Sequence, residues 1–290
     1  MKKFDYLKPN TLEEALSLLN QYGDRAKMIA GGTDAIVMNR QKKISPDVFI
    51  SLRGIPGLDQ IEFNGIFKIG ALVTHRTIEQ SELIRKRFPI LAGASSVLGS
   101  VQVRNVATIG GNLCTASPSA ETSPSLLVYE AEAHLVSQNG ERRLSLESFF
   151  VGPGENALDK KEILKGILLP SPPPNSVGAY LKLGRRKSVD LSVVNVAVLL
   201  TLDPKTGICE RARIALGAVA PTPLRAKETE KILEGNLLDD GIIRKAGDCA
   251  KQECSPITDI RGSAEYRREM AGVLVEKGIR QSLVNHSRIV

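Results

Sequence analysis

The chain has 290 residues, of which 42% are hydrophobic and 24% are charged, and its formal net charge is +7. This ordinary globular composition excludes a disordered chain, a collagen-like repeat and a disulfide-dense miniprotein. No uncharged apolar run reaches the roughly 18 to 20 residues that a membrane helix needs, and the length predicts about two domains.

The predicted elements of the first part of the chain follow from hydrophobic periodicity and capping residues. Helical segments are predicted at residues 11–22, 78–83, 89–98 and 118–131. Short strands are predicted at residues 48–52, 67–72, 133–137 and 162–169. The first helix has the clearest start signal, because Thr11 and Glu14 have the spacing of a capping box.

A run of prolines at residues 170–174 marks the predicted domain boundary. After this boundary, strands are predicted at residues 179–183, 191–202 and 212–219, with a hairpin turn at 203–207. Helices are predicted to close the chain at residues 223–235, 239–252 and 263–284.

Two glycine pairs, each after an apolar segment, are candidates for a binding site. Loop one is Ala30-Gly31-Gly32-Thr33-Asp34, and loop two is Thr108-Ile109-Gly110-Gly111-Asn112. Glycine permits positive φ and the close approach of a ligand, and successive N–H groups can form a nest for a pyrophosphate. Alone, each pair fits an ordinary turn better; the repetition favours a nucleotide cofactor held from two sides without settling it.

A third glycine motif, at residues 152–157, fits the G-x-G-x-x-A pattern of dinucleotide sites but is interpreted as a surface turn. Pro153 removes a donor N–H, and the position about 20 residues further on is Pro174, not an acidic residue. The chain contains no P-loop and no H-E-x-x-H motif. Its cysteines form no C-x-x-C pair, so no metal site is predicted.

The basic charge suits an anionic cofactor, an acidic partner subunit or nucleic acid. Aromatic residues make up only 4% of the chain and Trp is absent, so nucleic acid is not expected. Basic clusters at residues 40–43, 85–87 and 185–187 are interpreted as solvated faces, with cofactor or partner contacts as the alternative. The N-terminus has no signal-peptide pattern, so we expect a cytoplasmic chain with reduced cysteines.

With both glycine loops placed, the chain resembles the FAD-binding medium subunit of the molybdenum hydroxylases, the family of xanthine dehydrogenase and aerobic carbon monoxide dehydrogenase. The resemblance rests on loop one and on a long motif around loop two, from Arg104-Asn105 through Ala116-Ser117-Pro118 to Glu121. It continues in three later segments, which are Lys182-Leu183-Gly184-Arg185-Arg186, Gly217-Ala218-Val219-Ala220-Pro221-Thr222-Pro223 and Arg261-Gly262-Ser263-Ala264-Glu265-Tyr266-Arg267-Arg268.

This resemblance implies an α+β fold with two domains. The first is an FAD-binding domain of the p-cresol methylhydroxylase type, made of two α/β lobes. The second contains a three-stranded antiparallel sheet and a helix bundle. The expected FAD-binding domain covers residues 1–174, with lobes at about 1–55 and 56–174, and the C-terminal domain covers residues 175–290.

The resemblance also implies which residues surround the FAD. Loop one is expected to meet the pyrophosphate, and loop two the diphosphate and its neighbours. Cys114 is expected near the flavin ring, Glu121 at a ribose hydroxyl, Leu164 against the adenine and Lys182 near the FAD. The expected cofactor-binding residues are Ala30, Gly31, Gly32, Thr33, Asp34, Ala35, Thr108, Gly110, Gly111, Asn112, Cys114, Glu121, Leu164 and Lys182.

Two comparisons within the family sharpen these expectations. Glu121 stands where the family usually has Asp, so the ribose contact is expected to be remade or lost. One branch, the 4-hydroxybenzoyl-CoA reductases, inserts a cysteine-rich loop that holds a four-iron cluster. Residues 115–150 contain no cysteine, so no such cluster is expected.

The implied function is electron transfer in a multi-subunit molybdenum hydroxylase. A molybdenum-cofactor large subunit oxidises the substrate, a [2Fe-2S] small subunit relays the electrons, and FAD on this chain passes them to NAD or another acceptor. The expected assembly is a dimer of heterotrimers, and no catalytic residue is assigned to this chain. The alternatives are a stand-alone flavin oxidase or reductase, and a non-redox scaffold without FAD.

Overall fold

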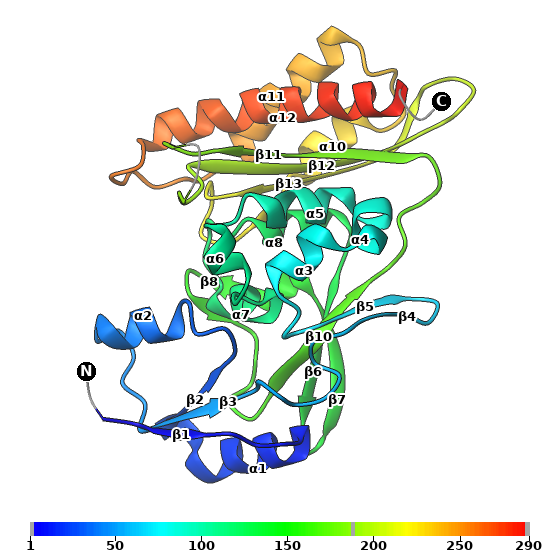
Figure 1. The fold of residues 1–290 in the computed structure, drawn as a ribbon. Helices are drawn as coiled ribbons and strands as arrows, with labels where there is room; N and C mark the ends of the chain where they lie inside the picture. Colours follow the sequence, from blue (N-terminus) through cyan, green and yellow to red (C-terminus); the bar gives the residue numbers. More distant parts are fainter. Residues whose placement is uncertain (1–2, 187–188, 288–290) are drawn as a thin grey trace.

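A computed structural model describes residues 3–186 and 189–287. The three larger sheets follow one another along the molecule, with helices between the second and third of them and on the outer face of the third (Figure 1). Helices and sheets are therefore mixed, as the predicted α+β class requires. Among the described helices, none is long and apolar enough to cross a lipid bilayer.

The N-terminal sheet is small and parallel. It consists of β1 (Asp5–Leu7), β2 (Ala26–Ile29) and β3 (Val48–Ser51), in the order β1-β3-β2. The apolar stripe of α1 (Leu12–Tyr22) packs into the core under this sheet. The edge strand β2 leads into loop one and then into α2 (Ala35–Arg40), so loop one lies at an open sheet edge.

The start of α1 is as predicted. The Thr11 side chain accepts a hydrogen bond from the Glu14 backbone N–H at 3.1 Å. The Glu14 carboxylate in turn accepts one from the Asn10 backbone N–H at 2.7 Å. The first bond occupies an N–H group that the first helical turn leaves without a partner, and the second holds the residue before the N-cap.

The central sheet is antiparallel, in the order β4-β5-β10-β6-β7. Its strands are β4 (Ile61–Phe63), β5 (Phe67–Gly70), β6 (Glu132–Ser137), β7 (Gly140–Ser145) and β10 (Ile163–Leu169). The helices between β5 and β6 are α3 (His75–Gln80), α4 (Glu82–Arg87), α5 (Pro89–Ser96), α6 (Val101–Arg104), α7 (Ile109–Thr115) and α8 (Thr122–Val128). After β7 come α9 (Leu146–Phe149) and the hairpin of β8 (Phe150–Gly152) and β9 (Glu155–Asn156).

Two helices of this region differ from the prediction. The segment at 78–83 is divided, because Ser81 ends α3 and its hydroxyl accepts a hydrogen bond from the Ile84 backbone N–H, which starts α4. The helix predicted at 118–131 begins only at Thr122. Residues before it form a turn, and the Pro118 carbonyl accepts a hydrogen bond from the Ala218 N–H at 2.6 Å. A tertiary contact therefore replaces the predicted first turn.

The C-terminal sheet is antiparallel and contains β11 (Ser176–Leu183), β12 (Val194–Leu202), β13 (Cys209–Gly217) and β14 (Leu224–Arg225). The sheet therefore contains one short strand more than the predicted three; this strand, β14, pairs with β13. Because these residues form a strand, the helix predicted from residue 223 starts later. The helices are α10 (Lys227–Leu233), α11 (Asp240–Glu253) and α12 (Ala264–Ser287).

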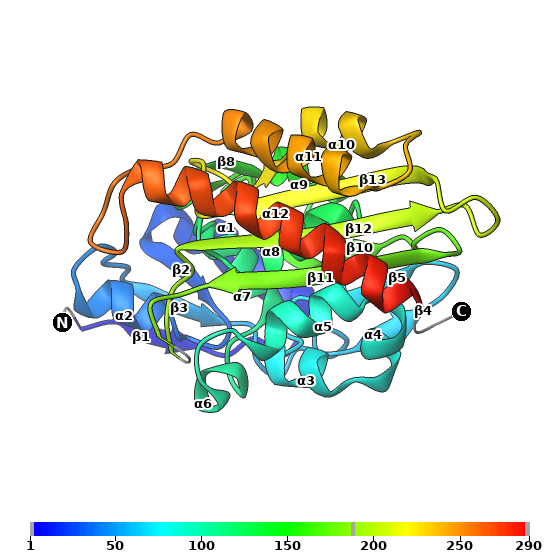
Figure 2. The same cartoon turned by 90° about the horizontal axis from the view of Figure 1, so that it is seen from above.

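The C-terminal sheet is covered on both faces. Helices α10, α11 and α12 lie across its outer face (Figure 2), whereas α5 and α8 of the central part pack against the inner face. Every residue of β12 is buried, because this strand is in the middle of the sheet and has helices on both sides. This packing joins the C-terminal sheet to the segment that contains loop two.

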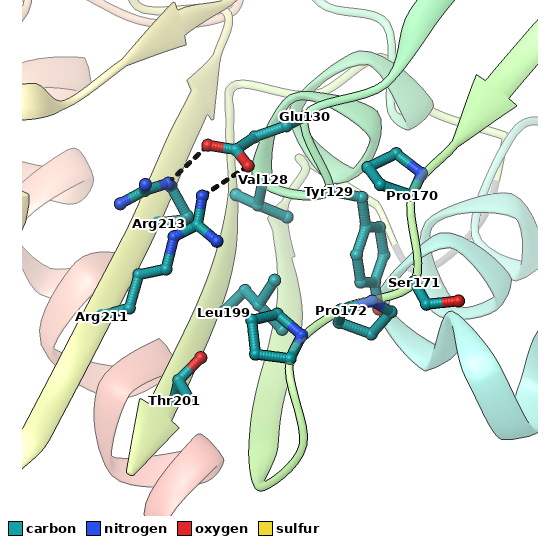
Figure 3. A pocket seen from close by; sticks show the side chains of 11 residues that line it. Val128, Tyr129, Glu130, Pro170, Ser171, Pro172, Leu199, Thr201, Arg211 and Arg213 are labelled. Atoms are coloured by element: carbon teal, nitrogen blue, oxygen red, sulfur yellow. Dashed lines mark hydrogen bonds and ion pairs between the residues drawn. The ribbon is translucent and has the colours of Figure 1, made fainter. Parts of the chain in front are cut away.

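Ion pairs strengthen the same junction. Glu130 accepts hydrogen bonds from Arg211 and Arg213 on β13, at 2.5 and 2.9 Å (Figure 3). Although burial opposes ionisation, the two guanidinium groups hold the pKa of Glu130 below its ordinary value. A pocket of about 150 Å³ lies beside this pair, between Tyr129, the prolines of the linker and β12 and β13. No residue of either glycine loop lines this pocket.

Candidate cofactor-binding site

Loop one presents a row of unused backbone donors. Among the described residues, the backbone N–H groups from Ala30 to Ala35 have no hydrogen-bond partner. Gly32 has a φ of +78°, a conformation that other residues rarely adopt. The loop is half-buried to exposed, so these donors can reach a ligand. A series of free N–H groups next to a glycine with positive φ is suited to an anion.

Loop two has the same glycine pair but no free donors of this kind. The Ile109 and Gly110 N–H groups donate to the carbonyls of Val73 and Ala71, at 3.0 and 2.9 Å. The Gly111 N–H donates to the Thr108 hydroxyl, which caps α7, at 3.1 Å. The Asn112 N–H is bonded to the Thr108 carbonyl. Loop two is therefore not the nest of N–H groups that the sequence suggested.

The two loops lie against each other. A Cβ atom on Gly31 would lie 2.0 Å from the Val106 carbonyl oxygen, so only glycine permits this approach. The Asp34 carboxylate accepts a hydrogen bond from the Thr115 hydroxyl on α7 at 2.9 Å. Asp34 occupies the N-cap position of α2, but its side chain makes no capping bond there. The structure thus brings together the two loops that the sequence separates by more than seventy residues.

The glycines of loop two have different environments. A Cβ on Gly110 would lie within 2.7 Å of Ala71, so Gly110 is required for packing against the end of β5. A Cβ on Gly111 would meet only the Thr108 hydroxyl, at 3.0 Å. The Gly111 position is therefore less crowded than that of Gly110, because its only close neighbour is a side-chain hydroxyl and not backbone.

Asn112 and Cys114 follow on α7. The Asn112 side-chain oxygen accepts a hydrogen bond from the Thr122 hydroxyl at 2.7 Å, which leaves its amide N–H₂ without a partner among the described residues. Cys114 is half-buried, and burial raises the pKa of its thiol to about 12, so the thiol is protonated at neutral pH. Its carbonyl accepts a hydrogen bond from Asn156 on the β8–β9 hairpin at 2.8 Å.

Glu121 and Lys182 form a buried ion pair between the segment after loop two and β11. The Lys182 ammonium donates to the Glu121 carboxylate at 2.8 Å, and also to the carbonyls of Asp190 and Val97. Burial raises the pKa of Glu121 above its ordinary value, although Lys182 favours the charged form. The Glu121 carboxylate is thus engaged within the protein, at the position expected to meet a ribose.

Leu164 lies on β10, next to α7, and is only 3% exposed. It pairs across the sheet with Leu135 and belongs to the core of the central part. It therefore offers almost no surface to a ligand in this structure. Its expected contact with an adenine stays a prediction.

Several residues around the loops were not identified from the sequence. Thr115 and Thr122 hold Asp34 and Asn112 in place, and isolated threonines give no signal in a single sequence. Asn156 belongs to the third glycine motif, which is a surface hairpin as predicted, with Gly154 at a φ of +81°. His75 is fully buried behind loop two, and its backbone N–H donates to the Ala107 carbonyl.

The part of the chain that the structure describes contains no group of three or more His, Cys, Asp or Glu residues arranged to hold a metal ion. All four cysteines are free thiols. In the basic cluster at 185–187, Arg185 and Arg186 are exposed, whereas Lys187 lies outside the described residues.

The chain is similar to known proteins along nearly its whole length. Residues 2–172 match the family described as "FAD binding domain in molybdopterin dehydrogenase", and residues 179–282 match "CO dehydrogenase flavoprotein C-terminal domain". The carbon monoxide dehydrogenase medium chain of Afipia carboxidovorans is 32% identical over 96% of both chains. The nicotinate dehydrogenase FAD-subunit of Eubacterium barkeri is 37% identical over 81% of both.

Solved structures show the same relationship. A chain of the carbon monoxide dehydrogenase from Hydrogenophaga pseudoflava superposes with a TM-score of 0.94, at 32% identity, over 98% of both chains. The predicted resemblance and the predicted fold class are thereby confirmed. The chain belongs to the FAD-binding medium subunits of the molybdenum hydroxylases, the family of carbon monoxide dehydrogenase and xanthine dehydrogenase.

Proposed function

We propose that loop one of this chain binds the diphosphate of FAD. The observation that carries the proposal is the row of unpartnered N–H groups from Ala30 to Ala35, beside Gly32 at positive φ. A diphosphate has enough acceptor oxygens to use several of these donors at once. The loop fits the group because Gly31 and Gly32 carry no side chain and the Asp34 carboxylate is bonded to the Thr115 hydroxyl.

Loop two has a different part in the same proposal. The Gly111 backbone, the Thr108 hydroxyl and the free amide of Asn112 would meet the cofactor beyond the phosphates. Cys114, Glu121, Leu164 and Lys182 complete the proposed set. Because the Lys182 ammonium already donates a hydrogen bond to the Glu121 carboxylate, a ribose hydroxyl would have to share that carboxylate with it.

The proposed activity is electron transfer. FAD, when bound, takes up electrons singly or in pairs and gives them to an acceptor. The residues of this chain hold the cofactor, orient it and exclude water from its buried side. We assign no general acid or base, because neutral His75 is enclosed and the Cys114 thiol is protonated.

The proposed setting is a multi-subunit complex. The chain would receive electrons from [2Fe-2S] clusters of a small subunit, after oxidation of the substrate by a molybdenum-cofactor large subunit. It would deliver them to NAD or another acceptor, within a dimer of heterotrimers. The free cysteines are consistent with the reducing cytoplasm that we propose as its location. We propose residues 1–174 as the FAD-binding domain, with lobes at about 1–55 and 56–174, and residues 175–290 as the C-terminal domain.

The test compares two equivalent substitutions, Gly32→Asp and Gly235→Asp. Gly32 and Gly235 have φ of +78° and +79°, and a Cβ meets nothing closer than 3.4 Å at either position. The backbone strain is therefore matched, whereas only Gly32→Asp places a carboxylate at the proposed phosphate site. We expect flavin absorbance and heat-released FAD to disappear from Gly32→Asp and to persist in Gly235→Asp. Equal FAD content in both variants would contradict the site.

A further inference from the structure

The two most exposed large apolar side chains of the described residues lie at one end of the C-terminal sheet, with a third exposed one on a neighbouring connection. Ile260 and Ile257, on the α11–α12 connection, are 90% and 70% exposed, and Leu191 on the β11–β12 connection is 54% exposed. Arg185 Nη1 donates to the Ile260 carbonyl at 3.2 Å, so the two connections are in direct contact. Both lie at the same end of the molecule in Figure 1 and Figure 2. Exposed apolar residues that gather in this way mark interaction sites.

The α11–α12 connection is anchored to the core. The Asp259 carboxylate accepts hydrogen bonds from the side chains of Arg261 and Arg267, both at 2.6 Å. Arg267 is buried and also donates to the Val193 and Ala218 carbonyls. Although burial opposes ionisation, these bonds hold the pKa of Asp259 well below its ordinary value. Two exposed isoleucines on an anchored connection are preorganised for contact, which lowers the entropy cost of binding.

The same end is positively charged. A hollow of about 310 Å³ is lined by Arg185, Arg186, Arg261 and Asp190. The carboxylate of Asp190 is 11% exposed and accepts hydrogen bonds from the backbone N–H groups of Arg185 and Arg186, whereas the Arg186 side chain is 70% exposed. No described carboxylate forms an ion pair with Arg185. The Arg185 and Arg186 side chains are therefore exposed, whereas Arg261 is partly buried and paired with Asp259, and Asp190 faces inward.

We propose that this end, made of Arg185, Arg186, Leu191, Ile257, Ile260 and Arg261, is the docking surface for a partner subunit of the same complex. The partner face would carry acidic side chains around an apolar depression that receives Ile260. A small anion would explain the arginines but not the two anchored, exposed isoleucines. Charge complementarity selects an acidic partner and aligns it. The inference rests on the proposed function, because it requires that the chain works in a complex.

The experiment uses a tagged chain purified with its partners from its native source. Ile260→Asp is compared with Leu237→Asp, because Leu237 is also well exposed, at 62%, but lies beside the β12–β13 turn. The readouts are iron, molybdenum and FAD per chain, with circular dichroism as the folding control. We expect Ile260→Asp to weaken association about tenfold or more while FAD per chain stays unchanged. Leu237→Asp is expected to retain the wild-type iron and molybdenum.

A charge reversal provides a second, independent measurement. Arg185→Glu should also reduce iron and molybdenum per chain, and added salt should narrow its difference from the wild type, because salt screens exposed charges. Lys205→Glu on the β12–β13 turn is the matched control.

Three results would overturn the docking surface. They are wild-type iron and molybdenum in both Ile260→Asp and Arg185→Glu, an equal loss in Leu237→Asp, or a wild-type chain that purifies with FAD alone. Absence of FAD from the wild-type chain would instead contradict the proposed function, so the two failures are distinguishable.

Discussion

Loop one and loop two contain the same glycine pair, yet their backbone N–H groups differ in whether they have hydrogen-bond partners. In loop one the N–H groups from Ala30 to Ala35 are free, and the loop lies at an open sheet edge. In loop two the corresponding groups bond to the end of β5 or to Thr108. Loop one therefore offers free backbone donors, whereas the donors of loop two are used within the protein.

The comparison teaches that a glycine can be required for reasons unrelated to a ligand. Gly31 and Gly110 are each in contact with a neighbouring backbone segment, and a Cβ on either would collide with it. Gly32 provides positive φ, whereas a Cβ on Gly111 would meet only the Thr108 hydroxyl, at 3.0 Å. Of these four glycines, only Gly32 has a positive φ.

The largest expected effect comes from removing the anchor of the segment after loop two. Lys182→Met leaves the Glu121 carboxylate buried without its partner, and this should cost about 3–5 kcal/mol of unfolding free energy. The double variant Glu121→Gln with Lys182→Met should cost less, because no buried charge is left. Urea denaturation of both variants measures the difference. Equal losses would show that the ion pair is not what anchors loop two.

Acid should destabilise the chain through His75, which lies behind loop two. Burial lowers the pKa of His75, behind loop two, from 6.5 to about 4, with Arg104 acting in the same direction. His75 therefore binds a proton below pH 6.5 in the unfolded chain, but only below about pH 4 in the folded chain. Stability should fall by about 3 kcal/mol as pH decreases from 6.5 to 4, and the loss should be complete below that. In His75→Gln this part of the pH dependence should vanish, and an unchanged pH profile in that variant would exclude His75 as its source.

The smallest expected effects on stability come from glycine-to-alanine substitutions, one in each loop. Gly31→Ala forces a Cβ against the Val106 carbonyl and should cost about 2 kcal/mol or more, with loss of FAD as the loops move apart. Gly111→Ala should change stability by less than about 1 kcal/mol, because alanine favours the helix and only the Thr108 hydroxyl is near. Melting temperature and FAD content of each variant provide the measurement. A stable Gly31→Ala that retains FAD would argue against loop contact as the basis of the site.

Much of the fold could be predicted because local signals agreed with tertiary packing. The α1 helix begins at its capping residues, and the hairpin between β12 and β13 falls at the predicted turn. The prediction failed where a distant partner decided the conformation. The Pro118 carbonyl is bonded to Ala218 instead of starting a helix, and β14 forms only because β13 lies beside it.

The sequence by itself determined which segments form the two glycine loops, because paired glycines after apolar strands are a local pattern. It also identified the family, since its motifs extend along nearly the whole chain. Only the tertiary structure decided which loop is free to bind and which is already bonded. Whether a backbone N–H has a partner depends on what lies across from it, and for loop two that partner is the end of β5, far away in the chain.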